Sequence, residues 1–220
     1  ANGRQNNFLN AGDNVSVTAT FSEGAPSAVI VESGTAELTI VVGSDNRTAS
    51  YASGSGTTVS GSGNASLVFQ YTIQATGTSG ENDDDGISIP ANALNSGSIT
   101  IRDPAGNIAT DLTHSTVPDN SSFKVDTIRP SVDNFTMDDR EIIVNDNATV
   151  TLVFSEEVIL FNSDSDITHP NGELSTMTTN DNETWIGYFT PTLGIEDDTN
   201  TLSLANNSYT DLAGNPGPDN

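Results

Sequence analysis

The stretch "VNDNATVTLVFSE", residues 144–156, decides the fold class of this protein. After an Asp-Asn turn, apolar side chains occupy every second position, at Val150, Leu152 and Phe154. A period of two places alternate side chains on opposite faces of a β-strand, so the stretch is predicted to be a strand with one buried face. This strand is expected to end at the Phe-Ser-Glu sequence, which closes on Glu156.

An earlier stretch repeats this plan. "AGDNVSVTATFSE", residues 11–23, also leads from an Asp-Asn turn into alternation and ends on Phe-Ser-Glu. A second shared motif, Asp-x-x-Gly-Asn, follows a β-patterned run at residues 103–107 and again at residues 211–215. Two motifs in the same order indicate an internal repeat. We therefore predict two domains, 1–128 and 129–220, joined by a short linker in which Pro130 favours extended backbone.

The composition agrees with an all-β protein and excludes several classes of function. Short β-branched runs alternate with Gly, Asn and Asp, and the chain has no cysteine, which excludes disulfides and thiolate metal sites. With six basic and 30 acidic residues the net charge is −24, so nucleic acid and anionic lipid are not expected partners. No apolar run is long enough to cross a membrane. An acidic surface serves solubility as readily as cation binding.

The same residues resemble a known family. The second half, with "ATVTLVFSEEV", "YFTPTLGIEDDTNTLSL" and "YTDLAGNPG", resembles the bacterial Ig-like repeats of large surface adhesins. The first half, with "GDNVSVTATFSE" and "GSITIRDPAGNIA", is similar to a sister repeat, although no clear strand precedes Phe8 and residues 25–37 carry an apparent insertion. The resemblance implies two tandem Ig-like Greek-key β-sandwiches on the cell surface, cut from a longer protein.

An Ig-like topology predicts where the two motifs meet. The loops after the second and sixth strands emerge at the same end of such a sandwich. Glu156, Asp211 and Asn215 are therefore expected to gather beside the linker residue Asp126. Calcium takes six to eight oxygen ligands from carboxylates, amides and backbone, so these side chains form a predicted calcium site. The Asp-x-x-Gly-Asn motif is also typical of a structural turn that binds no metal, since Asp can accept hydrogen bonds from its own backbone and Gly and Asn both tolerate positive φ.

The first domain is expected to contribute further ligands. Its acidic loop is predicted to approach the linker from the other side, and its own Phe-Ser-Glu and Asp-x-x-Gly-Asn motifs are predicted to hold a second ion. Acidic turns are also commonly just solvated surface. The residues predicted in this way are Asp83, Asp84 and Asp85 for the linker site and Glu23, Asp103 and Asn107 for the second site.

Three classes of function follow. Catalysis is not expected, because His114 and His169 stand in turn-like contexts with no nucleophile or paired zinc ligand. The prediction is a monomeric, calcium-binding spacer of an adhesin, acting in cell adhesion and contacting neighbouring repeats of its own chain. The alternative is a module that binds a cell-surface glycan, a peptide or another copy of itself.

Aromatic residues of the second half are expected to fill its core, because an aromatic side chain in a strand is usually a packing residue. The predicted core residues are the aromatic Phe161, Trp185, Tyr188 and Phe189, together with Ile167.

Overall fold

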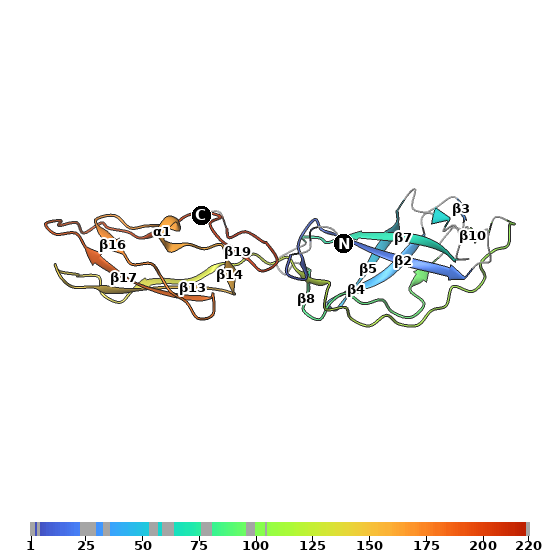
Figure 1. Ribbon diagram of the computed structural model, residues 1–220. Helices are drawn as coiled ribbons and strands as arrows, with labels where there is room; N and C mark the ends of the chain where they lie inside the picture. Colours follow the sequence, from blue (N-terminus) through green and yellow to red (C-terminus); the bar gives the residue numbers. More distant parts are fainter. Residues whose placement is uncertain are drawn as a thin grey trace. The chain divides into compact units, whose positions relative to one another are not determined.

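The protein is described by a computed structural model, which covers residues 3, 5–22, 30–32, 36–52, 57–58, 64–75, 81–95, 100–103 and 105–218. Contacts between Cα atoms divide the chain into two units, Ala1–Thr127 and Ile128–Asn220. Each unit is built from β-strands (Figure 1). The prediction of an all-β protein with two β bodies is confirmed.

The first unit has short strands around one long antiparallel pair. Its strands are β1 (Phe8–Leu9), β2 (Asn14–Ser22), β3 (Ile30–Glu32), β4 (Glu37–Val42), β5 (Asp45–Tyr51), β6 (Thr57–Thr58), β7 (Asn64–Thr72), β8 (Asn82–Asp83), β9 (Leu94–Asn95), β10 (Thr100–Arg102) and β11 (Lys124–Asp126).

The main sheet of the first unit has the order β2-β7-β5-β4-β9, with β6 added on β7. β2 and β7 pair antiparallel over nine residues, from Asn14 opposite Thr72 to Ser22 opposite Asn64. Leu67 and Phe69 of β7 are completely buried, whereas Val17, Ala19 and Phe21 of β2 are only partly buried and pack against the core. The alternation in residues 11–23 therefore predicts the strand correctly but overestimates the burial of its inward side chains.

Smaller sheets complete the first unit. β1 pairs in parallel with β11, and β8 pairs antiparallel with β11, which brings Leu9 and Val125 into the core. The predicted insertion at residues 25–37 contains β3, which pairs with β10. Residues 25–29 and 33–35 of this insertion lie outside the described residues.

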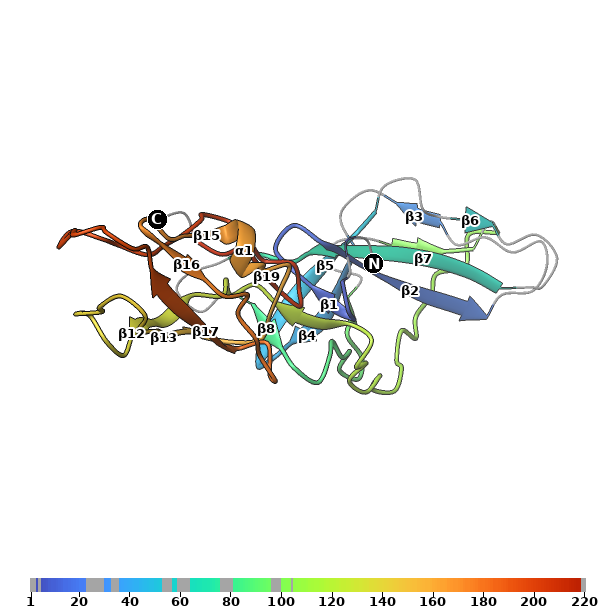
Figure 2. The ribbon, with the colours of Figure 1, turned by 60° about the vertical axis from the view of Figure 1, so that its left-hand side comes forward.

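The second unit is organised around a four-stranded antiparallel sheet of order β12-β13-β17-β16, with two-stranded ladders β14–β19 and β15–β18. Its elements are β12 (Val132–Met137), β13 (Ala148–Phe154), β14 (Val158–Ile159), α1 (Ser163–Asp166), β15 (Ile167–Thr168), β16 (Gly172–Leu174), β17 (Thr184–Pro191), β18 (Ser203–Leu204) and β19 (Thr210–Asp211). Figures 1 and 2 both show α1 on the side of the unit opposite β13.

β13 forms the centre of the second core. Ala148, Val150, Leu152 and Phe154 are fully buried, and the residues between them are partly exposed. This pattern confirms the strand and the buried face that the period of two predicts. Strands on both sides of β13 remove its backbone groups from solvent, which explains why it is buried more deeply than β2.

Aromatic rings fill the space between β13 and the smaller ladders. The Phe154 ring centroid lies 5.5 Å from that of Phe161 and 4.5 Å from that of Tyr209, and Phe161 meets Trp185 edge-on at 4.9 Å. Phe161 and Ile167 are buried, as predicted. Edge-on and tilted ring pairs of this kind stabilise a core beyond the area they bury.

The prediction for Tyr188 is wrong, because 55% of this residue is exposed. Its neighbour Phe189 is 5% exposed. Side chains alternate across β17, so Phe189 facing the core sends Tyr188 to the solvent face.

A single helical turn interrupts the strands of the second unit. The Asn162 side chain accepts a hydrogen bond from the Asp164 backbone N–H and so caps α1 at its N-terminus. The Asp166 carboxylate accepts the Asn162 backbone N–H at 2.7 Å. Among the described residues, no helix has the length and apolar character that crossing a membrane would require.

Candidate metal site

The turn at residues 211–215 is held together by the side chain of its first residue. Asp211 ends β19, and its Oδ1 accepts the Asn215 backbone N–H at 2.8 Å while its Oδ2 accepts the Asn215 side-chain N–H at 2.7 Å. Gly214 has φ +86°, a conformation that glycine adopts without steric cost. Asp211 is 1% exposed and Asn215 is 6% exposed, so the turn supplies hydrogen bonds to a buried carboxylate.

The same turn occurs at residues 103–107 of the first unit. Asp103 accepts the Asn107 backbone and side-chain N–H groups, each at 2.7 Å, and Gly106 has φ +93°. These hydrogen bonds, first that from the Asn107 side chain, lower the pKa of the Asp103 carboxyl. Asn107 is exposed and Asp103 is partly exposed. The motif therefore specifies one turn geometry, and the surroundings decide how deeply it is buried.

Glu156 reaches the same end of the second unit as Asp211. It follows β13 directly, and the β14–β19 ladder places Val158 opposite Asp211. Ser155 fixes the chain here through two hydrogen bonds of 2.9 Å: its N–H donates to the Ser131 carbonyl, and its Oγ accepts the Ser131 N–H. The serine of the Phe-Ser-Glu motif thus ties the end of β13 to the start of β12.

Asp126, Glu156 and Asp211 form an acidic cluster. Each offers one carboxylate oxygen, and these oxygens lie within 4.8 Å of one another; Asp211 is buried and the other two are half-buried. In the part of the chain that the structure describes, this is the one group of three or more such side chains placed to hold a metal ion. Like charges this close repel one another, and a divalent cation would offset the repulsion.

The donor set suits calcium. All three groups are carboxylates, which are hard oxygen ligands, and calcium tolerates irregular geometry better than magnesium does. Each Asp211 oxygen already accepts one hydrogen bond, and a carboxylate oxygen has a second lone pair to offer a cation. The hydrogen bonds of the turn and the coordination of an ion are therefore compatible at Asp211.

The acidic loop of the first unit has a different arrangement from the one predicted. Asp83 is 4% exposed, and its oxygens accept the Gly43 N–H at 2.9 Å and the Gly86 N–H at 2.6 Å. Burial raises the pKa of this carboxyl, and the two backbone N–H groups oppose that rise. Asp84 and Asp85 are exposed. The acidic cluster contains none of these three residues.

Sequence reasoning missed a buried carboxylate in the same loop. Glu81 is 3% exposed and accepts hydrogen bonds from Arg47 Nε at 2.5 Å, from the Tyr71 hydroxyl, and from the Gln74 backbone N–H at 2.8 Å. Burial together with the Glu81 carboxylate raises the pKa of Tyr71. Glu81 joins three segments of the first unit. One signal in the sequence points to such a pair: Arg47 is one of only six basic residues among 30 acidic ones, so an acidic partner for it is expected.

Arg129 is a second residue whose role the sequence did not reveal. Its Nε donates to the Pro216 carbonyl at 2.8 Å, and its Nη2 donates to the Gly217 carbonyl at 2.5 Å and to Asn207 Oδ1 at 3.2 Å. A guanidinium presents several donors in a fixed plane, which suits adjacent carbonyls. Arg129 therefore fastens the segment after the Asp211 turn to the start of the second unit.

Four predicted ligands remain to be placed, namely Glu23, Asp103, Asn107 and Asn215. Glu23 lies outside the described residues. Asp103 and Asn107 form their own turn, as described above, and Asp103 is not a member of the cluster. Asn215 is adjacent to the cluster through its hydrogen bonds with Asp211.

Comparison with known proteins bears on the second unit. Residues 126–220 match a family described as "Bacterial Ig-like domain". This part of the chain is a bacterial Ig-like domain. All three carboxylates of the acidic cluster fall within the matched range. A search of the curated proteins finds no match to the chain.

The match to the bacterial Ig-like family indicates which classes of function to expect. Such domains are commonly found on surface or secreted proteins, and they are usually non-catalytic structural modules. Both histidines agree with a structural role. His114 Nε2 accepts the Ala93 backbone N–H at 2.8 Å, and His169 Nδ1 is 3.1 Å from the Gly172 carbonyl oxygen.

Proposed function

We propose that the chain is a non-catalytic structural module of a bacterial surface adhesin, in which calcium bound by Asp126, Glu156 and Asp211 stiffens the start of the Ig-like domain. The observation that carries this proposal is the convergence of three carboxylates that lie 30 and 55 positions apart along the chain, within 4.8 Å of one another. The family match supports a surface or secreted protein.

The ion would join three segments. Asp126 precedes β12, Glu156 follows β13, and Asp211 ends β19. A cation held by all three would restrain the chain where it enters the Ig-like domain, and restraining that entry is what a spacer in an extended protein needs. Ligands that bind only the folded state also stabilise it, by an amount that grows with their concentration.

Calcium titration followed by calorimetry tests the proposal. The wild-type chain should bind calcium, and the variant Glu156→Gln should bind it at least tenfold more weakly, because an amide oxygen replaces a charged ligand. Asp133→Asn removes one charge from an exposed position of β12 and serves as the matched control. Equal calcium affinity in all three proteins would refute the metal site.

Small-angle scattering tests the spacer role separately. The particle should be longer and narrower in calcium than in chelator, and Asp126→Ala should lose most of this response. Scattering curves that overlay in calcium and chelator would contradict the stiffening role, whether or not calcium binds.

A further inference from the structure

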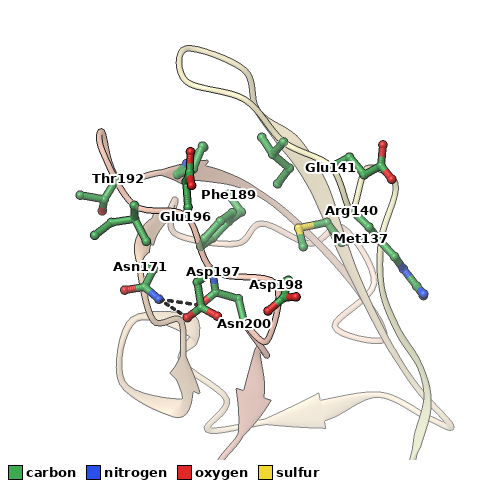
Figure 3. A pocket seen from close by; sticks show the side chains of 13 residues that line it. Met137, Arg140, Glu141, Asn171, Phe189, Thr192, Glu196, Asp197, Asp198 and Asn200 are labelled. Carbon is green, nitrogen blue, oxygen red and sulfur yellow. Dashed lines mark hydrogen bonds between the residues drawn. The ribbon is translucent and has the colours of Figure 1, made fainter.

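A cavity of about 840 Å³ opens in the Ig-like domain between the loop that follows β12 and the loop that follows β17 (Figure 3). We call it the loop cavity, and it is lined by residues of 137–142, 189–200 and by Asn171. Its volume lies within the range of about 300–1,000 Å³ that is typical of small-molecule binding pockets. Neither the acidic cluster nor any residue of its turn lines it.

Apolar side chains are concentrated at this cavity. Met137 and Phe189 lie between the two loops (Figure 3), and Ile195, which also lines the cavity, is 49% exposed. The same two loops carry Leu193, which is 78% exposed, and Ile143, which is 71% exposed. A group of exposed apolar side chains on a soluble domain commonly marks an interaction surface.

The charge of the lining is negative. Glu141, Glu196, Asp197 and Asp198 line the loop cavity, against a single Arg140. Asp197 is held in place, because its Oδ1 accepts the Thr199 N–H and hydroxyl and its Oδ2 accepts the Asn171 amide at 2.9 Å. These hydrogen bonds lower the pKa of Asp197, which keeps its carboxylate ionised.

The lining argues against three other occupants. In the described residues the group of carboxylates placed to hold a metal is the acidic cluster, which shares no residue with this cavity. No Trp or Tyr lines the cavity, so it lacks the exposed ring on which a sugar stacks. A second copy of the chain would bring another net charge of −24 towards the same acidic loops.

We propose that the loop cavity is a docking site for a basic, apolar peptide segment of another protein. Its Lys or Arg side chains would pair with Glu196 and Asp198 at the rim, and its apolar side chains would cover Ile195 and Leu193. Charge complementarity of this kind selects partners and speeds their association. The proposal does not depend on calcium at the acidic cluster.

Binding of two synthetic pentapeptides to the full chain tests the proposal. The probe is acetyl-Leu-Arg-Leu-Lys-Leu-amide, and the control replaces its Arg and Lys with Glu. Isothermal titration in EDTA should detect the basic peptide and not the acidic one. In spectra of the isotope-labelled chain, amide shifts should be confined to residues 137–142 and 189–200. Because EDTA removes calcium, failure here would leave the proposed metal site untouched.

Two variants separate the charged and apolar contributions. Glu196→Gln combined with Asp198→Asn should weaken binding about three- to tenfold, because two partly screened ion pairs are lost. Ile195→Ser should weaken it by a similar factor without changing its dependence on salt. Asp133→Asn is again the charge-matched control. All these positions are exposed, so circular dichroism should show unchanged folding.

Three results of the peptide experiments would overturn the proposal. They are equal binding of the basic and acidic peptides, unchanged affinity in the double variant, and amide shifts spread over surfaces away from the two loops. Self-association of the chain that is lost in Ile195→Ser would also overturn it, since a second copy would then be the occupant.

Discussion

Asp211 has two opposing effects on the stability of the Ig-like domain, and substitution can separate them. Its buried carboxylate satisfies two N–H groups of Asn215, and it also lies within 4.8 Å of the ligand oxygens of Asp126 and Glu156. Asp211→Ala removes both the hydrogen bonds and the repulsion. Glu156→Gln removes repulsion and leaves the 211–215 turn intact. In chelator, these two variants should therefore change the free energy of unfolding in opposite directions.

The structure gives the size of each effect. Asn215 is 6% exposed, so leaving its two N–H groups without an acceptor would each lower the free energy of unfolding by about 1–3 kcal/mol. Water entering the space left by the carboxylate limits the total loss to about 3 kcal/mol. Two unit charges within 4.8 Å of each other repel by about 1 kcal/mol in a water-like dielectric, which suits the half-buried partners. Each variant removes two such pairs, or about 2 kcal/mol of repulsion, so in chelator Asp211→Ala should destabilise by about 1 kcal/mol and Glu156→Gln should stabilise by about 2 kcal/mol.

Trp185 supplies the assay. It is the only tryptophan in the chain, it belongs to the second unit, and its ring packs against Phe161. Urea unfolding followed by its fluorescence therefore reports on the Ig-like domain. With a slope of about 1 kcal/mol per molar urea, the expected changes in midpoint are about 1 M downward for Asp211→Ala and about 2 M upward for Glu156→Gln.

Calcium should reverse the order of stability of the wild type and Glu156→Gln. With saturating ion, repulsion is already offset in the wild type, so Glu156→Gln should become the less stable protein. The control Asp133→Asn, in an exposed position of β12, should stay within about 0.5 kcal/mol of wild type in both buffers. If Glu156→Gln destabilises the domain in chelator, the three carboxylates do not repel as their distances require, and the reasoning is refuted.

Two further predictions concern other carboxylates. Glu81→Gln should lower the stability of the first unit by about 2–3 kcal/mol, measured by calorimetry, because the buried carboxylate pairs with an Arg47 side chain that is 29% exposed; a transition equal to wild type would count against a structural role. Hydrogen bonds from the Thr184 and Glu183 N–H groups and from Thr179 lower the pKa of Asp181. Its stabilisation is therefore present above the unfolded value of about 3.9 and is lost as the pH falls through the lower folded value. Asp181→Ala should flatten the acid dependence of the Trp185 midpoint below about pH 4, and an unchanged slope would contradict this cause.

The sequence predicts the elements whose signal is local. The alternation at Val150, Leu152 and Phe154 is sufficient to place β13 and its buried face. The Asp-x-x-Gly-Asn motif predicts a turn, because the same residues that would bind an ion also bond to one another. The approach of Glu156 to Asp211 follows from the order of strands in an Ig-like sandwich rather than from either residue alone.

The remaining features depend on partners that a local pattern does not contain. In the sequence, Glu81 has the pattern of an acidic residue in a solvated loop. Its structural role depends on hydrogen bonds from Arg47 in β5 and Tyr71 in β7. The sequence around Arg129 predicts a linker. The carbonyl groups that its side chain contacts are 87 and 88 residues away in the chain, so no local pattern reveals them. Residue type alone predicts Tyr188 in the core, but the period of two that predicts β13 places it on the opposite face from Phe189.

In the described structure β2 ends its sheet, and its nine residues include no charged side chain. A strand in that position offers unpaired amide and carbonyl groups to any similar strand it meets. Proteins commonly block such contacts with a lysine or proline placed on the strand itself, and β2 has neither. The net charge of −24 carried by every copy provides a barrier that acts at long range. That field reaches about 10 Å at 0.1 M salt and about 3 Å at 1 M, so the colloidal stability of the protein is set by the ionic strength of its surroundings.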